Sequence, residues 1–256
     1  MPQRPRQQKP RSHRAERIPG MFLAAAGLSL AHAALSAETL FSVYTGSSHT
    51  RDSDLRLVLP GSGTDLTARD VRWDARPFKA APYYGLRAAH FFERYENWGA
   101  ALDFVHYKMY AKVDRTVSVD GMWKGARVAS LGPLNQYVQR FEISHGVNVL
   151  SLNGIYRWLD PRLAAGRLRP YAGAGLAYYR PHAEGVVGNV PFETGYEPSG
   201  FGYQLLAGAQ YQLTERTGLF VETKFNSGTA KVDFAGGRAE TPLRTFHLVG
   251  GISFAF

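Results

Sequence analysis

Apolar and polar residues alternate along much of the chain, in segments of about ten residues. The clearest segment is 201–213, where one face carries Tyr203, Leu205, Ala207, Ala209, Tyr211 and Leu213. Its other face is mostly Gly and Gln. Successive side chains of a strand point to opposite faces, so this period predicts a β-strand. A polar face of Gln and Gly suits a narrow, hydrogen-bonded interior, as in a transmembrane barrel.

The last segment, 245–256, also alternates, and its apolar face consists of Phe246, Leu248, Gly250, Ile252, Phe254 and Phe256. A closing strand with alternating apolar residues and a terminal Phe resembles the assembly signal of bacterial outer-membrane proteins. The segment therefore predicts the barrel assembly machinery as a partner.

The same pattern marks eight candidate strands, at about 38–48, 83–93, 98–111, 140–158, 169–180, 201–213, 219–230 and 245–256. The connections alternate in length. Residues 49–82, 112–139, 181–200 and 231–244 are long and polar, whereas 94–97, 159–168 and 214–218 are short. The sequence thus predicts an all-β fold, an eight-stranded antiparallel up-and-down transmembrane β-barrel over 38–256. The long connections would be external and both mature termini periplasmic.

Two features support the barrel. After Glu38 no run of 18 apolar residues occurs, which argues against helical spans. Trp98 and Trp158 lie at the ends of short connections, where an interfacial aromatic girdle is expected. Eight strands enclose a lumen that side chains fill, so no large pore is expected.

The N-terminus predicts export. Residues 1–37 hold six basic side chains against Glu16, then an apolar stretch from Met21 to Leu30, then Leu35-Ser36-Ala37. A charged region, a short apolar region and a small-residue site are typical of a cleavable signal peptide, here residues 1–37. An uncleaved N-terminal anchor is the alternative. The expected location is the outer membrane of a Gram-negative bacterium.

Charge and cysteine content exclude other classes. The net charge is +9, but residues 1–37 supply a surplus of five and leave +4 for the rest. No basic stripe with interleaved aromatic residues occurs, so nucleic acid is not an expected partner. The chain has no Cys, so disulfides do not stabilise it. No soluble-enzyme motif, such as a P-loop, G-x-S-x-G or H-E-x-x-H, is present.

Polar residues of chemical interest are concentrated in the third and fourth predicted strands. Asp103 and His106 have opposite parity, so one should face the lumen and the other should face outward. A simple register across the loop brings His106 and His145 to similar height. These positions predict an external site with catalytic candidates Asp103, His106, Lys108, Glu142 and His145. The alternative is a structural ion-pair network in the lumen, which is also the role expected of Glu222 and Lys224.

The external connections carry both charges. Basic side chains at that height can bind lipid A phosphates through charge-assisted hydrogen bonds, and the candidates are Arg72, Arg76, Lys79 and Arg140. Ordinary solvated loop charge is the alternative. Asp residues in the same connections are compatible with a divalent metal, but no ligand spacing identifies one. No organic cofactor site is evident.

Several blocks resemble a family of rhizobial-type lipid A oxidases of the outer membrane. They are Gly63-Thr-Asp65, Trp73-Asp-Ala-Arg-Pro-Phe78, Ala81-Pro-Tyr-Tyr-Gly85, Asp103-Phe-Val-His-Tyr-Lys108, Ser144-His-Gly-Val-Asn148, Leu152-Asn-Gly-Ile-Tyr-Arg-Trp158 and Leu248-Val-Gly-Gly-Ile-Ser253. The resemblance implies that lipid A or lipopolysaccharide is the partner. It further implies oxidation of the proximal glucosamine to 2-aminogluconate, with molecular oxygen as co-substrate.

Two other interpretations of the sequence stay open. One is a non-catalytic barrel of the OmpA or OmpW kind, which serves envelope integrity, adhesion or small hydrophobic solutes. The other is a soluble secreted β-sandwich, because soluble antiparallel sheets also alternate.

Overall fold

The computed structural model describes residues 38–79 and 82–256, and this part of the chain is built almost entirely from antiparallel strands. Two short 3-10 turns, Pro60–Ser62 and Leu134–Gln136, interrupt them. Within these residues, no helix has the length and hydropathy needed to cross a membrane. The predicted signal peptide, residues 1–37, lies outside the described residues.

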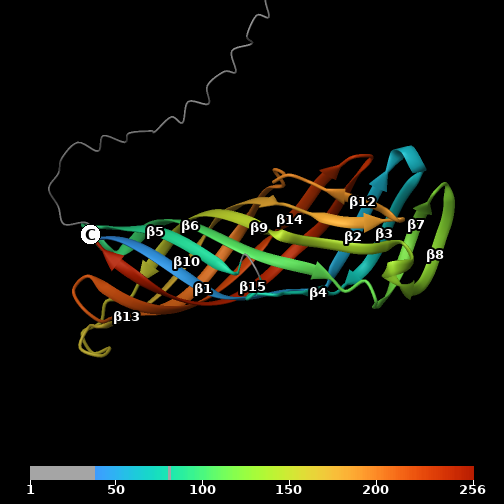
Figure 1. Cartoon of the computed structure of the whole chain (residues 1–256). Coiled ribbons are helices and arrows are strands. Elements are labelled where there is room, and N and C mark those ends of the chain that lie inside the picture. Colours follow the sequence, from blue (N-terminus) through green and yellow to red (C-terminus); the bar gives the residue numbers. More distant parts are fainter. Residues whose placement is uncertain (1–37, 80–81) are drawn as a thin grey trace, which may run out of the picture. The chain divides into compact units, whose positions relative to one another are not determined.

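A closed ring of strands forms the body of the fold (Figure 1). Each strand pairs with its neighbours in the order β1 (Glu38–Thr50), β5 (Tyr84–Phe92), β6 (Tyr95–Ala111), β9 (Val138–Arg157), β10 (Leu168–Pro181), β13 (Gly200–Gln212), β14 (Thr217–Phe234) and β15 (Gly237–Ala255). The ring closes where β1 pairs with β15, from Leu40 opposite Ala255 to Thr50 opposite Thr245. We call the end at which Glu38 and Phe256 lie the terminal end, and the other the extended end.

Each segment that the alternation marked as a strand falls on one strand of this ring. The short connections are the expected turns at the terminal end. The largest difference between predicted and observed bounds is in β15, which begins at Gly237 instead of near residue 245.

The segments expected as long polar connections contain strands of their own, which bring the sheet to 15 strands. They are β2 (Ser53–Leu59), β3 (Thr64–Val71), β4 (Trp73–Asp74), β7 (Thr116–Trp123), β8 (Ala126–Pro133), β11 (Glu184–Val187) and β12 (Val190–Glu193). The path continues from β15 through β2, β3 and β7 to β8. Figure 1 shows β3, β7 and β8 beyond the end of the ring.

Residues 231–244 illustrate why a sequence pattern predicts loops in these segments. Their charged residues suggest a solvated loop, but Val232, Ala239 and Leu243 are fully buried on one face. Strands β14 and β15 pair as far as Phe234 opposite Gly237, joined by a tight turn with Gly236 at φ +89°. The alternation in this segment is therefore that of a β-hairpin with one buried face and one solvent-exposed face.

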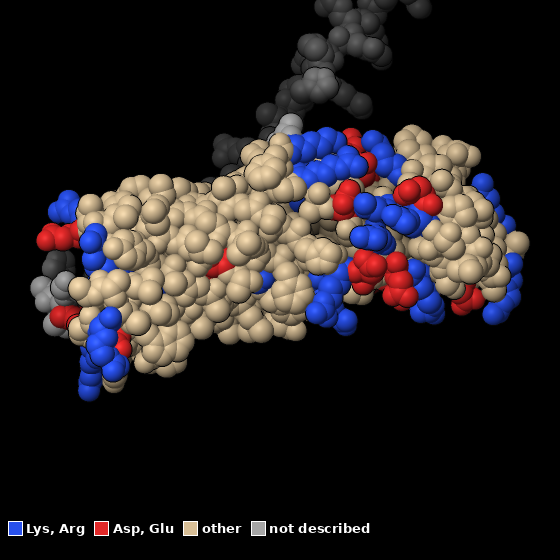
Figure 2. All heavy atoms as spheres, turned by 90° about the horizontal axis from the view of Figure 1, so that it is seen from below, with Lys and Arg blue, Asp and Glu red and all other residues tan. Residues whose placement is uncertain are grey.

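Outward-facing positions of the ring are apolar over a broad band. Exposed large side chains occur on every ring strand, among them Phe41, Leu86, Leu102, Leu152, Leu176, Leu205, Val221 and Leu248. Figure 2 shows that Lys, Arg, Asp and Glu gather toward the two ends, with a wide stretch between them that is almost free of charge. Such a large exposed apolar surface is rare on soluble monomers.

Inward-facing positions in the middle of the ring form a buried ionic network. Arg87 donates to both carboxylate oxygens of Glu222, at 2.7 and 2.6 Å. Lys224 lies 2.5 Å from Asp103 Oδ2, and Tyr44 donates to Asp103 Oδ1 at 2.7 Å. The expectation that Glu222 and Lys224 are interior ions is met, because both are 1% exposed.

Apolar side chains fill the interior on both sides of this network. At the terminal end a small cluster forms around Leu40, Phe91 and Ile155. Toward the extended end a larger cluster includes Trp73, Phe141, Ile143, Leu134 and Val138. Ionic network and apolar clusters together fill the lumen, as expected for a ring of this size.

The network predicts the cost of removing one of its charges. Asp103→Asn leaves Lys224 and Arg87 buried with less counter-charge, so we expect the free energy of unfolding to fall by about 3–5 kcal/mol. Chemical unfolding in phospholipid vesicles, followed by Trp fluorescence, measures it. Asp120→Asn, at an exposed position of β7, is the matched control and should be nearly neutral. Equal stability of the two variants would contradict the role given to the network.

Candidate functional site

Strand β6 presents different chemistry on its two faces. Asp103, Val105 and Tyr107 face inward and are 1% exposed. Leu102 faces outward in the apolar band at 51% exposed, and His106, Lys108 and Tyr110 continue this outward face toward the extended end. The opposite facing predicted for Asp103 and His106 is therefore observed, but the two are not parts of one site. Asp103 belongs to the interior network.

His106 is held at the edge of the apolar band. Its ring stacks on Tyr84 with centroids 4.9 Å apart and an interplanar angle of 19°. Its Nδ1 lies 2.8 Å from Asn148 Oδ1. Gly146 lies against the same imidazole, because a Cβ built at this glycine would lie 2.1 Å from His106 Cε1. The side chain is consequently buried, with 4% exposed, although it is on the outward face.

Tyr110 lies further along the same face, under two cations. The Arg76 guanidinium is 4.3 Å from the ring centroid and Lys79 Nζ is 5.2 Å from it. Arg76 and Lys79 come from the segment between β4 and β5, and β4 pairs directly with the end of β6. Among the described residues, neither cation has a carboxylate within 4.0 Å. Cation–π contact holds them without neutralising them.

A hollow of about 460 Å³ lies beside Tyr110. Arg76, Arg140 and Glu142 line it, and Glu142 is the cross-strand neighbour of Tyr110. We call the set His106, Lys108, Tyr110, Arg76, Lys79, Arg140 and Glu142 the outer-wall patch.

Glu184, on β11, borders the outer-wall patch. Ser144 donates a hydrogen bond to its carboxylate, and Arg140 lies 3.5 Å away. The Ser144 hydroxyl and the nearby Arg140 charge hold the pKa of Glu184 below its usual range. Glu184 is therefore anionic at neutral pH and partly offsets Arg140.

Two buried polar atoms of the outer-wall patch lack a partner among the described residues. They are Tyr110 Oη and His106 Nε2. A buried polar atom without a hydrogen bond is costly, and its presence needs an explanation such as an ordered water or a ligand. Both atoms belong to side chains on the outward face of β6 but are covered, so a ligand at the wall of the ring would reach them only by displacing the side chains that cover them.

His145 is not the cross-strand partner of His106. His106 pairs with Asn148, and residues 144–146 form an irregularity in the ladder between β6 and β9. Gly146 there has φ +107°. The simple register expected from the sequence was therefore wrong, because a β-bulge changes both height and facing.

His145 instead meets His182, with ring centroids 4.4 Å apart. Glu193, the last residue of β12, lies 3.3 Å from His182 Nε2. Sequence reasoning missed His182 and Glu193. The signal that could have found them is the hairpin between β11 and β12, whose turn holds Gly188 and Asn189 at positive φ.

Of the predicted phosphate-binding residues, Arg76, Lys79 and Arg140 belong to the outer-wall patch. Arg72, just before β4, is exposed and does not line the hollow. Of the predicted catalytic residues, His106, Lys108 and Glu142 lie in the patch, whereas Asp103 and His145 do not.

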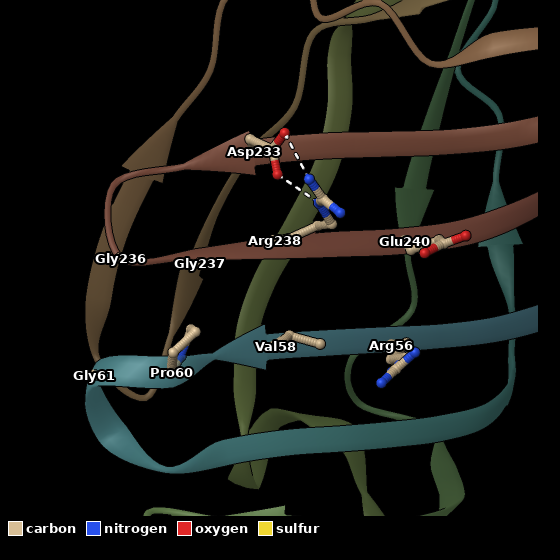
Figure 3. A pocket seen from close by; sticks show the side chains of 9 residues that line it. All are labelled: Arg56, Val58, Pro60, Gly61, Asp233, Gly236, Gly237, Arg238 and Glu240. Atoms are coloured by element: carbon tan, nitrogen blue, oxygen red, sulfur yellow. Dashed lines mark hydrogen bonds and ion pairs between the residues drawn. The ribbon is translucent and has the colours of Figure 1, made fainter.

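A larger cavity, of about 630 Å³, lies between β2 and the hairpin of β14 and β15 (Figure 3). Its cations are already paired. Arg238 contacts Asp233 at 2.6 Å, and Arg56 contacts Asp65 at 2.9 Å. The Arg56 hydrogen bond holds the pKa of Asp65 below its usual range. This cavity is therefore a poorer anion site than the outer-wall patch.

The contact between Gly146 and His106 leads to a prediction with a close control. Gly146→Ala should destabilise the protein by about 1–3 kcal/mol more than Gly236→Ala, since overpacking adds to backbone strain only at Gly146. Gly236 also has positive φ, but a Cβ added there would meet nothing within 4 Å. Chemical unfolding of the two variants measures the difference in their free energies of unfolding. NMR of the histidine side chains should show a shifted His106 imidazole signal in Gly146→Ala and an unchanged one in Gly236→Ala. An unmoved His106 signal would refute the contact.

Comparison with known proteins gives similarity at the level of fold. No family model matches the chain, and no curated protein matches it by sequence. Among solved structures, the outer membrane protein OprG from Pseudomonas aeruginosa is 12% identical with a TM-score of 0.45, covering 87% of this chain and 96% of that one. Neisserial surface protein A is 14% identical with a TM-score of 0.43, covering 86% and 99%. Ail of Yersinia pestis, the attachment invasion locus protein, is 11% identical with a TM-score of 0.38, covering 87% and 100%. At these values no binding or activity is transferred to this chain.

Proposed function

We propose that the chain is an outer-membrane β-barrel of a Gram-negative bacterium, and that its eight ring strands cross the membrane. The support is the combination of a closed ring and an apolar outward band. Lipid offers no hydrogen-bond partner to backbone groups, so a sheet can cross it only when it closes on itself. In this orientation the terminal end is periplasmic and the extended end is external.

Aromatic side chains near both edges of the apolar band support this orientation. Near the terminal end, Trp98 packs on Tyr156 at 4.9 Å and Tyr156 on Trp158 at 5.0 Å, with both Trp side chains about half exposed. Toward the extended end, Tyr178 packs on Phe201 at 5.2 Å. Amphipathic rings of this kind favour the interface between hydrocarbon and water.

The outer-wall patch binds the phosphorylated sugar headgroup of lipid A. The observation that carries this proposal is the pair of cations over Tyr110, which have no acidic partner among the described residues. They lie on the outward face, beyond the apolar band, at the height of lipid headgroups. Basic side chains there can donate charge-assisted hydrogen bonds to phosphate, while the acyl chains lie against the apolar wall.

Oxidation of lipid A is the further step that the family resemblance suggests. The C1–H carbon of a proximal glucosamine hemiacetal would lose two electrons and two protons. Molecular oxygen would take them up as hydrogen peroxide, and water would then open the resulting lactone to 2-aminogluconate. His106 Nε2, an atom of the patch that has no partner among the described residues, is the best-placed proton acceptor.

A non-catalytic barrel for envelope integrity or adhesion is the alternative to oxidation. It is favoured by the position of Asp103, which takes one of the predicted catalytic residues into an interior network. Headgroup binding at the patch is compatible with both.

Neutralising the patch tests headgroup binding. The triple variant Arg76→Gln, Lys79→Gln and Arg140→Gln should bind phosphorylated lipid A in nanodiscs about 100-fold more weakly, at about 1 kcal/mol per cation near an anionic surface. The control removes three exposed arginines that lie outside the patch, in Arg56→Gln, Arg69→Gln and Arg238→Gln. It should retain its affinity.

Two further arms sharpen this test. Lipid A without phosphates should bind the unmodified protein weakly, whereas free inorganic phosphate should compete poorly because it lacks acyl chains. If both triple variants lose affinity equally, general surface charge explains the binding and the patch does not.

Mass spectrometry of lipid A tests oxidation separately. When the protein is expressed in cells grown with oxygen, lipid A molecules whose proximal sugar carries no phosphate should gain the mass of one oxygen atom. His106→Ala should reduce that product by about 100-fold, a usual contribution of a general base. His49→Ala, at an exposed position of β1, is the control. An unchanged lipid A mass would reject the oxidase and leave the binding proposal standing.

A further inference from the structure

Three side chains at the extended end have the donor set of a metal site. We propose that His145, His182 and Glu193 bind one divalent transition-metal ion. Each offers one ligand atom, and these atoms all lie within 4.8 Å of one another. The ligands come from three places in the chain: the bulge of β9, the segment between β10 and β11, and the end of β12.

The ligand atoms lie close to the spacing that a bound ion requires. Ligand atoms about 2.0–2.1 Å from a tetrahedral zinc ion are about 3.3 Å from each other. His182 Nε2 and Glu193 Oε1 are already 3.3 Å apart. Since all three ligand atoms lie within 4.8 Å of one another, the His145 nitrogen has to approach the other two by at most about 1.5 Å. An ion pair between His182 and Glu193 would account for those two residues, but it would not account for a third donor arriving from another strand.

Backbone contacts hold the ligands in this arrangement. The His182 amide donates to Gly146 O at 3.2 Å, next to His145. Tyr196 donates its hydroxyl to His145 O at 2.8 Å, and its ring packs edge-on against His182 at 5.1 Å. Preorganised ligands lower the ordering cost of binding.

The donors identify the class of ion. Two imidazoles and one carboxylate suit Zn²⁺, Cu²⁺, Ni²⁺ or Fe²⁺, whereas Mg²⁺ and Ca²⁺ prefer oxygen ligands throughout. Three protein ligands leave a coordination position open, as in catalytic zinc sites, where structural sites use four. The proposal stands on this geometry alone and does not depend on the lipid-binding or oxidase proposals.

The experiment uses the untagged full chain in detergent micelles, washed with chelator and titrated with Zn²⁺ by calorimetry. We expect one ion per chain. His145→Ala and His182→Ala should each weaken binding by at least about 100-fold, because loss of an outer partner alone weakens metal sites 10–100-fold. The control His49→Ala, an exposed histidine on β1, should bind like the unmodified protein.

Spectroscopy of bound Cu²⁺ tests the ligands directly. The electron paramagnetic resonance spectrum should show coupling to two imidazole nitrogens, and each His→Ala variant should lose one. Heat-modifiable migration in gels verifies that each variant is folded, and Glu193→Gln supplies a near-isosteric variant that should also weaken binding. Zn²⁺ affinity unchanged by both His variants, or a Cu²⁺ spectrum without two nitrogens, would overturn the proposal.

Discussion

Closure of the ring through pairing of β1 with β15 is the constraint on which the other features depend. It gives the backbone groups of both terminal strands their partners, so no sheet edge remains within the ring. Closure also divides side chains strictly into inward and outward sets. An outward set that meets lipid can be apolar throughout, whereas an inward polar set is tolerable only when its members satisfy one another. The network of Arg87, Glu222, Asp103 and Lys224 largely meets that second condition: its charges are paired, and Arg87 Nε, which makes no hydrogen bond, lies 3.5 Å from Asp103 Oδ1.

Strand β6 carries the two consequences of this division on opposite faces. Asp103 stabilises the interior through partners far away in the sequence, while His106 and Tyr110, on the opposite face, each hold a buried polar atom without a partner among the described residues. Polar residues that are adjacent in sequence thus have unrelated roles. A cluster of titratable residues in a barrel strand has to be sorted by face before it can be interpreted as one site.

The features predictable from the sequence are those set by local periodicity. The alternation around Gln204 and around Phe246 located strands and their facing, since period 2 is a property of each strand alone. The parity of Asp103 and His106 followed from the same rule. Register was not predictable, because the irregularities near Lys108 and His145 shift strands against each other without a clear mark in the sequence. The partnership of His145 with His182 depends on that shift. The hairpin strands within 49–82 and 231–244 resemble loops in sequence because one of their faces is exposed to solvent and carries polar residues, which makes the segments polar on average.

The strand path beyond the ring ends at β8, which has a partner, β7, along one side of its ladder. An edge of this kind would be intolerable in hydrocarbon, but in water its amide groups are solvated. The closed ring therefore has a fixed circumference, whereas the sheet that continues beyond the ring ends at the free edge of β8. Insertions, deletions or an added strand at β8 leave the closure between β1 and β15 untouched. In the proposed orientation, the surface that the cell shows to its surroundings can therefore change while the ring that crosses the membrane stays closed.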